Sequence, residues 1–237
     1  MFLLGSIVNS GLIVVGVLIG KFLNRIPEKT KETVMYGIGL TVTILGLQMG
    51  LTSENFLIVI LSIVFGAMIG EYFGWEDKLN SLGIWLEKKV GSEGEGSIAK
   101  GFVTATLIFV IGAMAILGAL DSGIRGNHDI LYTKGIIDGF TAFILTTTLG
   151  IGVIFSAIPV LLYEGLIALF ATQINQIVPA ELMDQFIVEM TATGGAMILA
   201  LGLNLMGLTK VRVANLLPSV IVMGVIVTIL YFYKLYI

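Results

Sequence analysis

Long apolar runs, each close to the length of a membrane-crossing helix, constrain this chain more than any other feature. A helix needs about 20 apolar residues to cross a ~30 Å hydrocarbon core. Eight stretches come close to that length with few charges, roughly residues 3–23, 32–51, 55–73, 101–120, 136–158, 159–177, 182–208 and 213–234. Because these runs are too long and too uniformly apolar for barrel strands, the sequence predicts an all-α integral membrane protein with about eight transmembrane helices.

The composition agrees with a membrane protein. Hydrophobic residues make up 57% of the chain and charged residues 12%, with a mean hydropathy of +1.02, whereas a soluble domain carries about a quarter charged residues. The formal charge of -3 does not favour nucleic acid as a partner. The expected partner is the lipid bilayer.

Basic residues predict how the chain is oriented. Arg125, Lys134 and Lys234 lie on one side of the runs, and Lys134 is expected to end a polar loop that starts at Asp121. The other ten basic residues follow runs on the opposite side: Lys21, Arg25, Lys29, Lys31, Lys78, Lys88, Lys89, Lys100, Lys210 and Arg212. The positive-inside rule then places both termini outside.

We expect a single membrane domain over residues 1–237 with internal organisation. Residues 26–51 and 178–208 both begin with a Pro-containing pair and close on similar Leu- and Gly-rich segments, yet the loop count runs them in opposite directions. This pattern indicates an inverted-topology repeat, with three-span repeats at 1–73 and 159–237 around a central hairpin at 101–158. Residues 75–90 show helical spacing of apolar and charged side chains, which predicts an amphipathic helix on the inner surface. Residues 91–97 are typical of a flexible linker.

Small and hydroxyl-bearing residues gather near the predicted midplane. They lie in the second run at Thr41 and Thr43 and in the seventh at Thr193, Gly194 and Gly195. Close helix packing explains small residues in a membrane. A binding site at a broken helix explains them as well, and Gly194-Gly195 is the predicted break. Gln48 and Asn204, at matching places in the two repeats, suit interhelical hydrogen bonds or the same site.

Two carboxylates lie inside the apolar runs. Glu189 is about 10 Å inside the seventh run, and Glu164 is two turns into the sixth. A charge at the bilayer centre costs about 2.5–3.5 kcal/mol, so such residues face the protein interior and often mark transport pathways. The alternative is a purely structural hydrogen bond between helices. Asp121 and Asp138 flank the predicted outer loop and are candidates to line an entrance or to cap helix ends.

Several classes of chemistry are not predicted. With no Cys and a single His, a His/Cys zinc site or a His-Cys dyad cannot be built. His128 is expected in a loop apart from any embedded serine. We therefore expect no enzyme, no cofactor and no metal centre of this kind.

The chain resembles the bacterial membrane family called domain of unknown function 554. The resemblance covers essentially the whole chain and is carried by Gly101-Phe102-Val103-Thr104-Ala105-Thr106, Gly112-Ala113-Met114-Ala115-Ile116, Gly118, Asp121-Ser122-Gly123, Lys134, Asp138-Gly139, Glu189-Met190-Thr191-Ala192, Gly194-Gly195, Gly202-Leu203-Asn204, Arg212, Asn215 and Leu217-Pro218. It implies an integral protein of the bacterial inner membrane and supplies no substrate.

The leading hypothesis is a small secondary transporter of an ion or small solute. Its site would lie at the midplane between the repeats, with Glu189 titrating or binding a coupling cation. Residues of the seventh run would form one wall and those of the second run the other. An eight-span bundle is small for alternating access, so a homodimer is expected. The alternatives are an ion channel and a non-transporting scaffold or regulatory protein.

Overall fold

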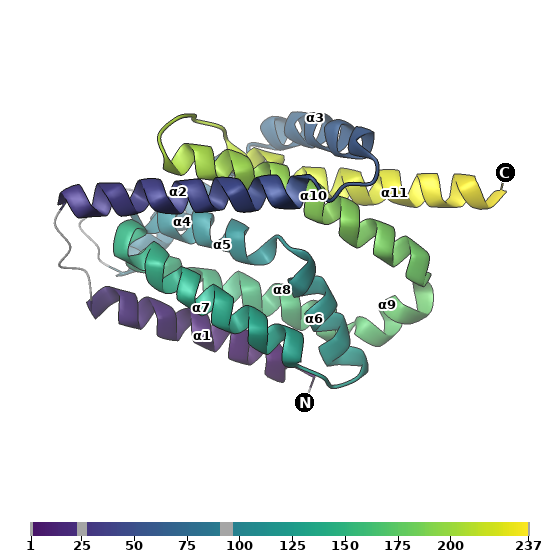
Figure 1. The fold of residues 1–237 in the computed structure, drawn as a ribbon, viewed down its shortest axis with the longest axis horizontal. Helices are drawn as coiled ribbons and strands as arrows, with labels where there is room; N and C mark the ends of the chain where they lie inside the picture. The colour runs from purple at the N-terminus through teal and green to yellow at the C-terminus, as the bar shows by residue number, and fades with distance from the viewer. Residues whose placement is uncertain (1, 23–27, 91–96, 237) are drawn as a thin grey trace. The chain divides into compact units, whose positions relative to one another are not determined.

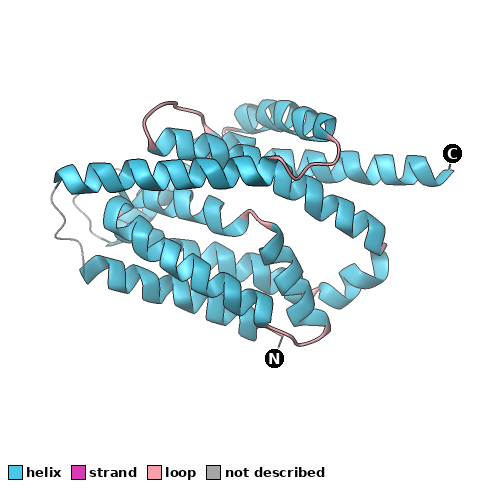
Figure 2. Cartoon of the chain, viewed as in Figure 1, coloured by secondary structure: helices cyan, strands magenta, loops and turns pink. Residues whose placement is uncertain are grey.

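The computed structural model describes residues 2–22, 28–90 and 97–236, and the regular elements within these ranges are helical (Figure 2). In chain order they are α1 (Leu4–Phe22), α2 (Glu28–Gly50), α3 (Phe56–Phe73), α4 (Trp75–Val90), α5 (Ser97–Val110), α6 (Ala113–Ile124), α7 (Asp129–Leu149), η1 (Ile151–Ser156), α8 (Ala157–Leu169), α9 (Ala171–Ile177), α10 (Ala180–Leu205), η2 (Val213–Leu216) and α11 (Pro218–Tyr236).

Six helical segments of the described chain are long and apolar enough to cross a membrane: α1, α2, α3, η1 with α8, α10, and η2 with α11. A seventh span is added if the bent pair α5 and α6 counts as one. Helix α7 is not in this set although it has 21 residues, because Lys134 and Asp138 interrupt its apolar run. The predicted all-helical membrane fold is confirmed. The described chain has six to seven helical segments that could span a membrane.

The fourth predicted span, 101–120, is not one straight helix. It is divided into α5 and α6 at Ile111–Gly112, and the two parts meet at 64° (Figure 2). The predicted break at Gly194-Gly195 is wrong, because α10 runs unbroken through both glycines. A buried helix keeps its backbone hydrogen bonds, so two glycines whose contacts are with a neighbouring helix need not interrupt it.

The boundary between the fifth and sixth predicted spans also differs. Helix α7 ends at Leu149 rather than near residue 158, because Gly150 has φ 79°, a backbone conformation that glycine readily adopts. The 3-10 helix η1 follows, and α8 begins at Ala157. Pro159 therefore lies in the first turn of α8, where it removes no helical hydrogen bond.

The predicted helix at residues 75–90 is observed as α4, which starts directly after Gly74 at the end of α3, and its place on the inner surface stays a prediction. Gly74 has φ 62° and caps α3 with backbone bonds to Glu71 and Gly70. Both Trp75 and Trp85 are exposed on α4, as suits a helix that lies at an interface. Of the predicted linker at 91–97, only Ser97 is among the described residues, where it begins α5.

The chain forms two compact units. Unit 1 comprises residues 1–38 and 79–174, and unit 2 comprises residues 39–78 and 175–237. These boundaries do not coincide with the predicted repeats at 1–73 and 159–237. The inverted repeat stays a prediction.

Unit 1 is organised around the contact between α1 and α7, which lie side by side (Figure 1). Glycines allow the two backbones to touch. A Cβ at Gly20 would lie 2.7 Å from the Phe143 carbonyl oxygen, and one at Gly139 would lie 2.8 Å from the Leu12 carbonyl oxygen. Close contact through small residues is the usual way to pack helices in lipid.

Unit 2 packs its helices in the same manner. Helix α3 lies against α11, and α10 contacts α11. The second half of α2 meets α10, where a Cβ at Gly46 would lie 2.7 Å from the Gly195 carbonyl oxygen. Farther along, a Cβ at Gly202 would lie 2.8 Å from the Gly39 carbonyl oxygen. The glycines of α2 and α10 thus serve close packing.

Candidate functional site

A buried cluster of polar and charged side chains lies inside unit 1. It joins Asn9 of α1, Lys134 and Asp138 of α7, and Glu164 of α8. None of the four is more than 7% exposed, and Asn9 and Glu164 are fully buried. We call these four residues the charge cluster. Because buried charges are costly in lipid, a cluster of this kind needs internal partners or a ligand.

The contacts within the charge cluster centre on Glu164. Its Oε1 atom accepts a hydrogen bond of 2.7 Å from Asn9 Nδ2 and lies 3.3 Å from Lys134 Nζ. Lys134 also forms an ion pair with Asp138, four residues later on the same helix. The second carboxylate oxygen of Glu164, Oε2, has no hydrogen-bond partner among the described residues.

The helix positions of the cluster place it at one level of unit 1. Asn9 lies five residues from the start of α1, Lys134 five residues from the start of α7, and Glu164 five residues from the end of α8. At 1.5 Å per residue each is about 8 Å from a helix end. The sequence predicts Glu164 two turns after the start of its span. In the structure Glu164 lies near the end of the helix instead, because α8 stops at Leu169.

The charge cluster is not electrically balanced. Two carboxylates face one ammonium group, so the fully ionised cluster carries one excess negative charge. An unpaired buried charge costs several kcal/mol. A cation that binds beside Glu164 would remove this cost, which makes the cluster a candidate ion-binding site.

Glu189, the sharpest sequence candidate, lies in unit 2 and is 3% exposed. Its carboxylate accepts hydrogen bonds from the Ser53 hydroxyl at 2.7 Å, the Asn55 amide at 3.0 Å and the Glu54 amide at 3.1 Å. These donors form the turn that leads into α3, where a negative charge is favoured by the unpaired amides and the helix dipole. The contacts are those of a structural bond between α10 and the start of α3. A transport role for Glu189 stays a prediction.

The other end of α3 is fixed in a similar way. Asn215 Oδ1 accepts from the Glu76 amide at 2.7 Å, and its Nδ2 donates to Glu71 at 2.6 Å. In return, Glu76 accepts from the Ala214 amide at 2.9 Å. Arg212 pairs with the second oxygen of Glu71 at 2.7 Å. Unit 2 thus uses its carboxylates to bind helix ends together.

Residues predicted to line a binding site on α10 and α2 make packing contacts or bond their own helix instead. Thr43 bonds the Gly39 carbonyl oxygen of its own helix at 2.7 Å, and a Cβ at Gly195 would lie 2.7 Å from the backbone of Met49. Gly194 and Thr193 are buried, and the Thr193 hydroxyl has no hydrogen-bond partner among the described residues. Thr41 and Gln48 lie on exposed positions of α2.

Asn204 does not lie near Glu189. Fifteen residues of continuous α10 separate them, which is about 22 Å. Asn204 instead organises the loop after α10: it accepts from the Thr209 hydroxyl and the Val211 amide and donates to the Val211 carbonyl oxygen. The prediction that Asn204 shares a site with Glu189 is wrong.

The predicted entrance residues also differ from expectation. Asp138 is buried in the charge cluster, so it does not line an entrance. Asp121 lies near the end of α6 and pairs with the exposed Arg125 at 2.6 Å. His128 is not apart from serine, because its Nδ1 lies 2.7 Å from the buried Ser122 hydroxyl. Ser122 also donates to the Phe2 carbonyl oxygen, so its hydroxyl proton is already used in a structural bond.

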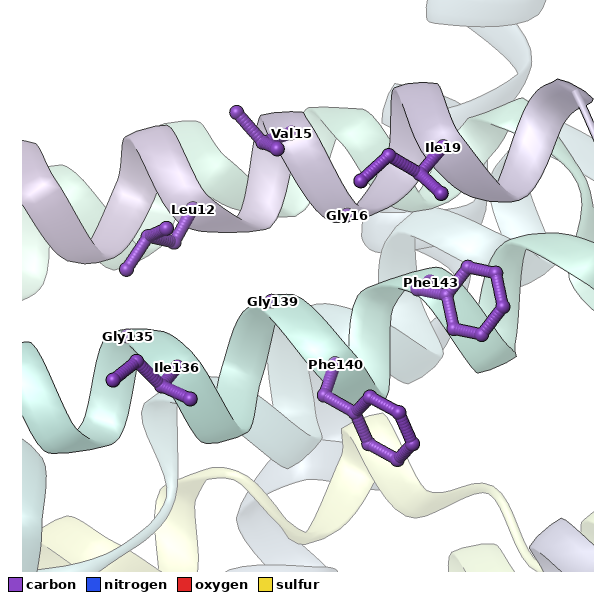
Figure 3. A pocket seen from close by; sticks show the side chains of 9 residues that line it. All are labelled: Leu12, Val15, Gly16, Ile19, Gly135, Ile136, Gly139, Phe140 and Phe143. Carbon is purple, nitrogen blue, oxygen red and sulfur yellow. The ribbon is translucent and has the colours of Figure 1, made fainter.

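An apolar groove of about 340 Å³ runs along the contact of α1 and α7 (Figure 3). Its lining is Leu12, Val15, Gly16, Ile19, Gly135, Ile136, Gly139, Phe140 and Phe143. No side chain in this lining carries a polar group that could bind an ion or orient a polar solute. The charge cluster therefore remains the candidate site of unit 1.

Sequence reasoning left Lys134 and Asn9 out of the site. Lys134 was predicted at the end of an outer loop, but α7 begins at Asp129, which places Lys134 inside the helix and 6% exposed. A signal was present: Lys134 and Asp138 are spaced by four residues, which brings them together on one helix face. Asn9 carried no signal for its partner, because Glu164 lies 155 positions away.

The fold and the buried polar groups define an all-helical, multi-helix membrane protein. The chain belongs to the family described as Protein of unknown function (DUF554), whose pattern it matches over residues 4–228. It is 29% identical over 237 residues to the uncharacterized membrane protein YdfK of Bacillus subtilis (strain 168), covering 98% of each chain. It is 28% identical over 226 residues to the uncharacterized protein YqgA of Escherichia coli (strain K12), covering 92% of this chain and 93% of that one. No solved structure matches the chain.

Proposed function

We propose that this protein is a secondary transporter of an ion or small solute, and that the charge cluster of unit 1 is its ion-binding site. The observation that carries the proposal is the excess negative charge around Glu164, buried beside an ion pair that neutralises only one carboxylate. Membrane proteins keep such groups where ions or protons pass. The site thus moves from Glu189, as the sequence suggested, to Glu164.

The break between α5 and α6 supports transport. Discontinuous helices free backbone groups inside the membrane, and such breaks recur at the binding sites of secondary transporters. Here the two parts are bent by 64° at Ile111–Gly112. Both belong to unit 1, the same unit as the charge cluster.

The membrane arrangement is part of the proposal. Counting the bent pair as one span and adding α7 gives eight crossings of the bacterial inner membrane, with both termini outside. With Lys134 inside α7, Arg125 and Lys234 are the basic residues left on the proposed outer side, which strengthens the positive-inside bias. In this topology the start of α1, the start of α7 and the end of α8 all face outward, so the charge cluster lies in the outer half of the membrane. Helix α4 lies on the inner surface of the membrane. The inverted repeat relates the first three spans to the last three.

Two further features belong to the same proposal. Two copies associate as a homodimer, because one eight-span bundle offers little mass for alternating access; light scattering of the detergent-solubilised protein tests this. The protein catalyses no covalent reaction and needs no cofactor. Either a monomeric mass or substrate turnover would contradict these parts.

Reconstituted flux tests the proposal. Purified protein in liposomes is given gradients of H⁺, Na⁺ and K⁺, and flux is followed with ion-sensitive dyes. We expect Glu164→Gln to abolish coupled flux. Glu189→Gln, normalised to folded protein, should retain most of it because its carboxylate binds a helix end.

The same measurement separates the alternatives. If Glu189→Gln lost ion flux and Glu164→Gln retained it, the ion-binding site would lie on α10. Unitary currents in planar bilayers would assign a channel. Flux that neither variant changes, together with loss of stability, would contradict transport through these groups and favour a scaffold.

A further inference from the structure

Among the described residues, four buried oxygen atoms of the charge cluster and of helix α1 lack hydrogen-bond partners. They are Glu164 Oε2 on α8 and, on α1, Asn9 Oδ1, Ser6 Oγ and Ser10 Oγ. Ser6, Asn9 and Glu164 are fully buried and Ser10 is 7% exposed. Buried polar groups are nearly always paired, so four unpaired oxygens on two helices in contact indicate a missing ligand.

The oxygens are brought together by helix geometry and one observed bond. Ser6, Asn9 and Ser10 are spaced by three and four residues, so they share one face of α1. Asn9 donates to Glu164 Oε1 at 2.7 Å, so the side chains that carry Asn9 Oδ1 and Glu164 Oε2 are in direct contact. The contact between Asn9 and Glu164 therefore joins the two helices that carry these oxygens.

The kind of ligand follows from charge and from the number of acceptors. A proton on Glu164 would neutralise the excess charge but would satisfy one oxygen. A water molecule would bond to several oxygens but would leave the charge. A metal cation meets several oxygens at once and adds charge, and oxygen is the ligand that hard cations prefer. One excess negative charge matches a single positive charge.

We propose that Ser6, Asn9, Ser10 and Glu164 bind one dehydrated Na⁺ ion, with Lys134 as the fixed positive charge of the site. The proposal rests on the proposed function, since it names the ion taken by the same charge cluster. Lys134 holds Asp138 and contacts Glu164 Oε1, so Oε2 is the oxygen left for the cation. The sequence indicates Glu164 as a candidate but not its partners on α1, because the two helices are distant in the chain.

A binding measurement tests the inference. The full-length protein in detergent is heated in NaCl, KCl or choline chloride of equal ionic strength. A ligand that binds only the folded state raises Tm in a saturable way. We expect Na⁺ to raise Tm by several degrees relative to choline and to show at least about tenfold higher apparent affinity than K⁺.

Variants assign the ligands. In Glu164→Gln the Na⁺-dependent rise should vanish, and in the double variant Ser6→Ala, Ser10→Ala the apparent Na⁺ affinity should fall at least about tenfold. Ser62→Ala is the matched control: Ser62 is fully buried, but it lies on α3 of unit 2 and bonds the Ile58 carbonyl oxygen at 2.6 Å. That control should keep the Na⁺ response.

The outcomes also separate this inference from transport. Equal Tm in Na⁺ and choline, or an unchanged Na⁺ response in the serine double variant, would overturn the Na⁺ site. If flux still depended on Glu164 in that case, the transporter would remain, coupled to protons. Na⁺ binding without any flux would uphold the site and overturn the transporter. If the variants fail to fold, equilibrium dialysis of wild type with radioactive Na⁺ decides: uptake of about one ion per chain supports the site and none overturns it.

Discussion

Each unit of the molecule buries a glutamate, and the two carboxylates differ in how many of their oxygens are hydrogen-bonded. In unit 2, Glu189 accepts three hydrogen bonds that involve both of its oxygens. In unit 1, Glu164 shares one oxygen between Asn9 and Lys134, and its other oxygen has no partner in the described part of the chain. A fully bonded carboxylate stabilises a fold. An incompletely bonded one retains capacity for a ligand, and this difference favours α8 over α10 as the place of the proposed site.

The largest effect is expected from packing, in which the two units are alike. Gly16→Ala in unit 1 and Gly70→Ala in unit 2 each place a Cβ against the backbone of a neighbouring helix, at Gly139 and Asn215 respectively. We expect each to cost more than about 3 kcal/mol and to abolish monodisperse protein, measured by size-exclusion chromatography.

Gly11→Ala provides the matched control on α1. A Cβ at Gly11 meets no atom within 4 Å, and alanine favours a helix over glycine by about 1 kcal/mol. This variant should be as stable as wild type or more so. Equal damage from Gly11→Ala and Gly16→Ala would contradict the close contact of α1 and α7.

The next effect compares the two glutamates directly. Glu189→Gln loses charge-assisted bonds to the start of α3 and should destabilise the protein by about 2 kcal/mol. Glu164→Gln removes an excess buried charge, so in choline buffer it should cost less than about 1 kcal/mol or stabilise. Thermal melts of both variants in Na⁺-free buffer check this order. A larger loss in Glu164→Gln would mean that its carboxylate is the structural one.

A smaller effect is expected at the other end of α3. Asn215→Ala removes the acceptor for the Glu76 amide and the donor to Glu71, and should cost about 1–2 kcal/mol. Because this contact belongs to unit 2, Na⁺-dependent stabilisation should persist in the variant. Loss of the Na⁺ response would show that the two units are coupled in ion binding.

The smallest effect is expected at Gln48, which the sequence placed in the site. Its side chain lies at an exposed position of α2, so Gln48→Leu should change stability by less than about 0.5 kcal/mol and leave flux intact. A flux loss of tenfold or more in proteoliposomes would restore α2 to the transport pathway.

The sequence predicts the positions of the helices well and the hydrogen-bond partners of buried side chains poorly. The run 55–73 corresponds to α3 at Phe56–Phe73, because apolar length alone defines a membrane helix. The burial of Glu189 was also predictable, since a charge in such a run must face inward. Its partners were not: Ser53, Glu54 and Asn55 lie at least 134 positions away, and only the folded chain brings them to α10.

Errors arose where one residue type had two explanations. The position of Lys134 near the edge of an apolar run predicts a loop residue, whereas its spacing to Asp138 belongs to a helix. Gly194 and Gly195 predict a helix break, whereas in the structure they permit close packing. The break lies at Gly112, in a run whose glycines looked no different. Periodicity predicts which face of a helix is buried, but it cannot distinguish a glycine that breaks a helix from one that packs it.

The ion pair of α7 has a consequence for how the protein is made. A helix that carries Lys134 and Asp138 enters lipid poorly by itself, because each charge at the centre of a helix costs about 2.5–3.5 kcal/mol on the insertion scale. Helix α1 leaves the ribosome first and is already in the bilayer when α7 follows. Its glycine face then gives α7 a surface that is not lipid, and Asn9 on the same helix faces the arriving charges. In the proposed eight-span topology, membrane insertion of α7 is therefore expected to depend on α1.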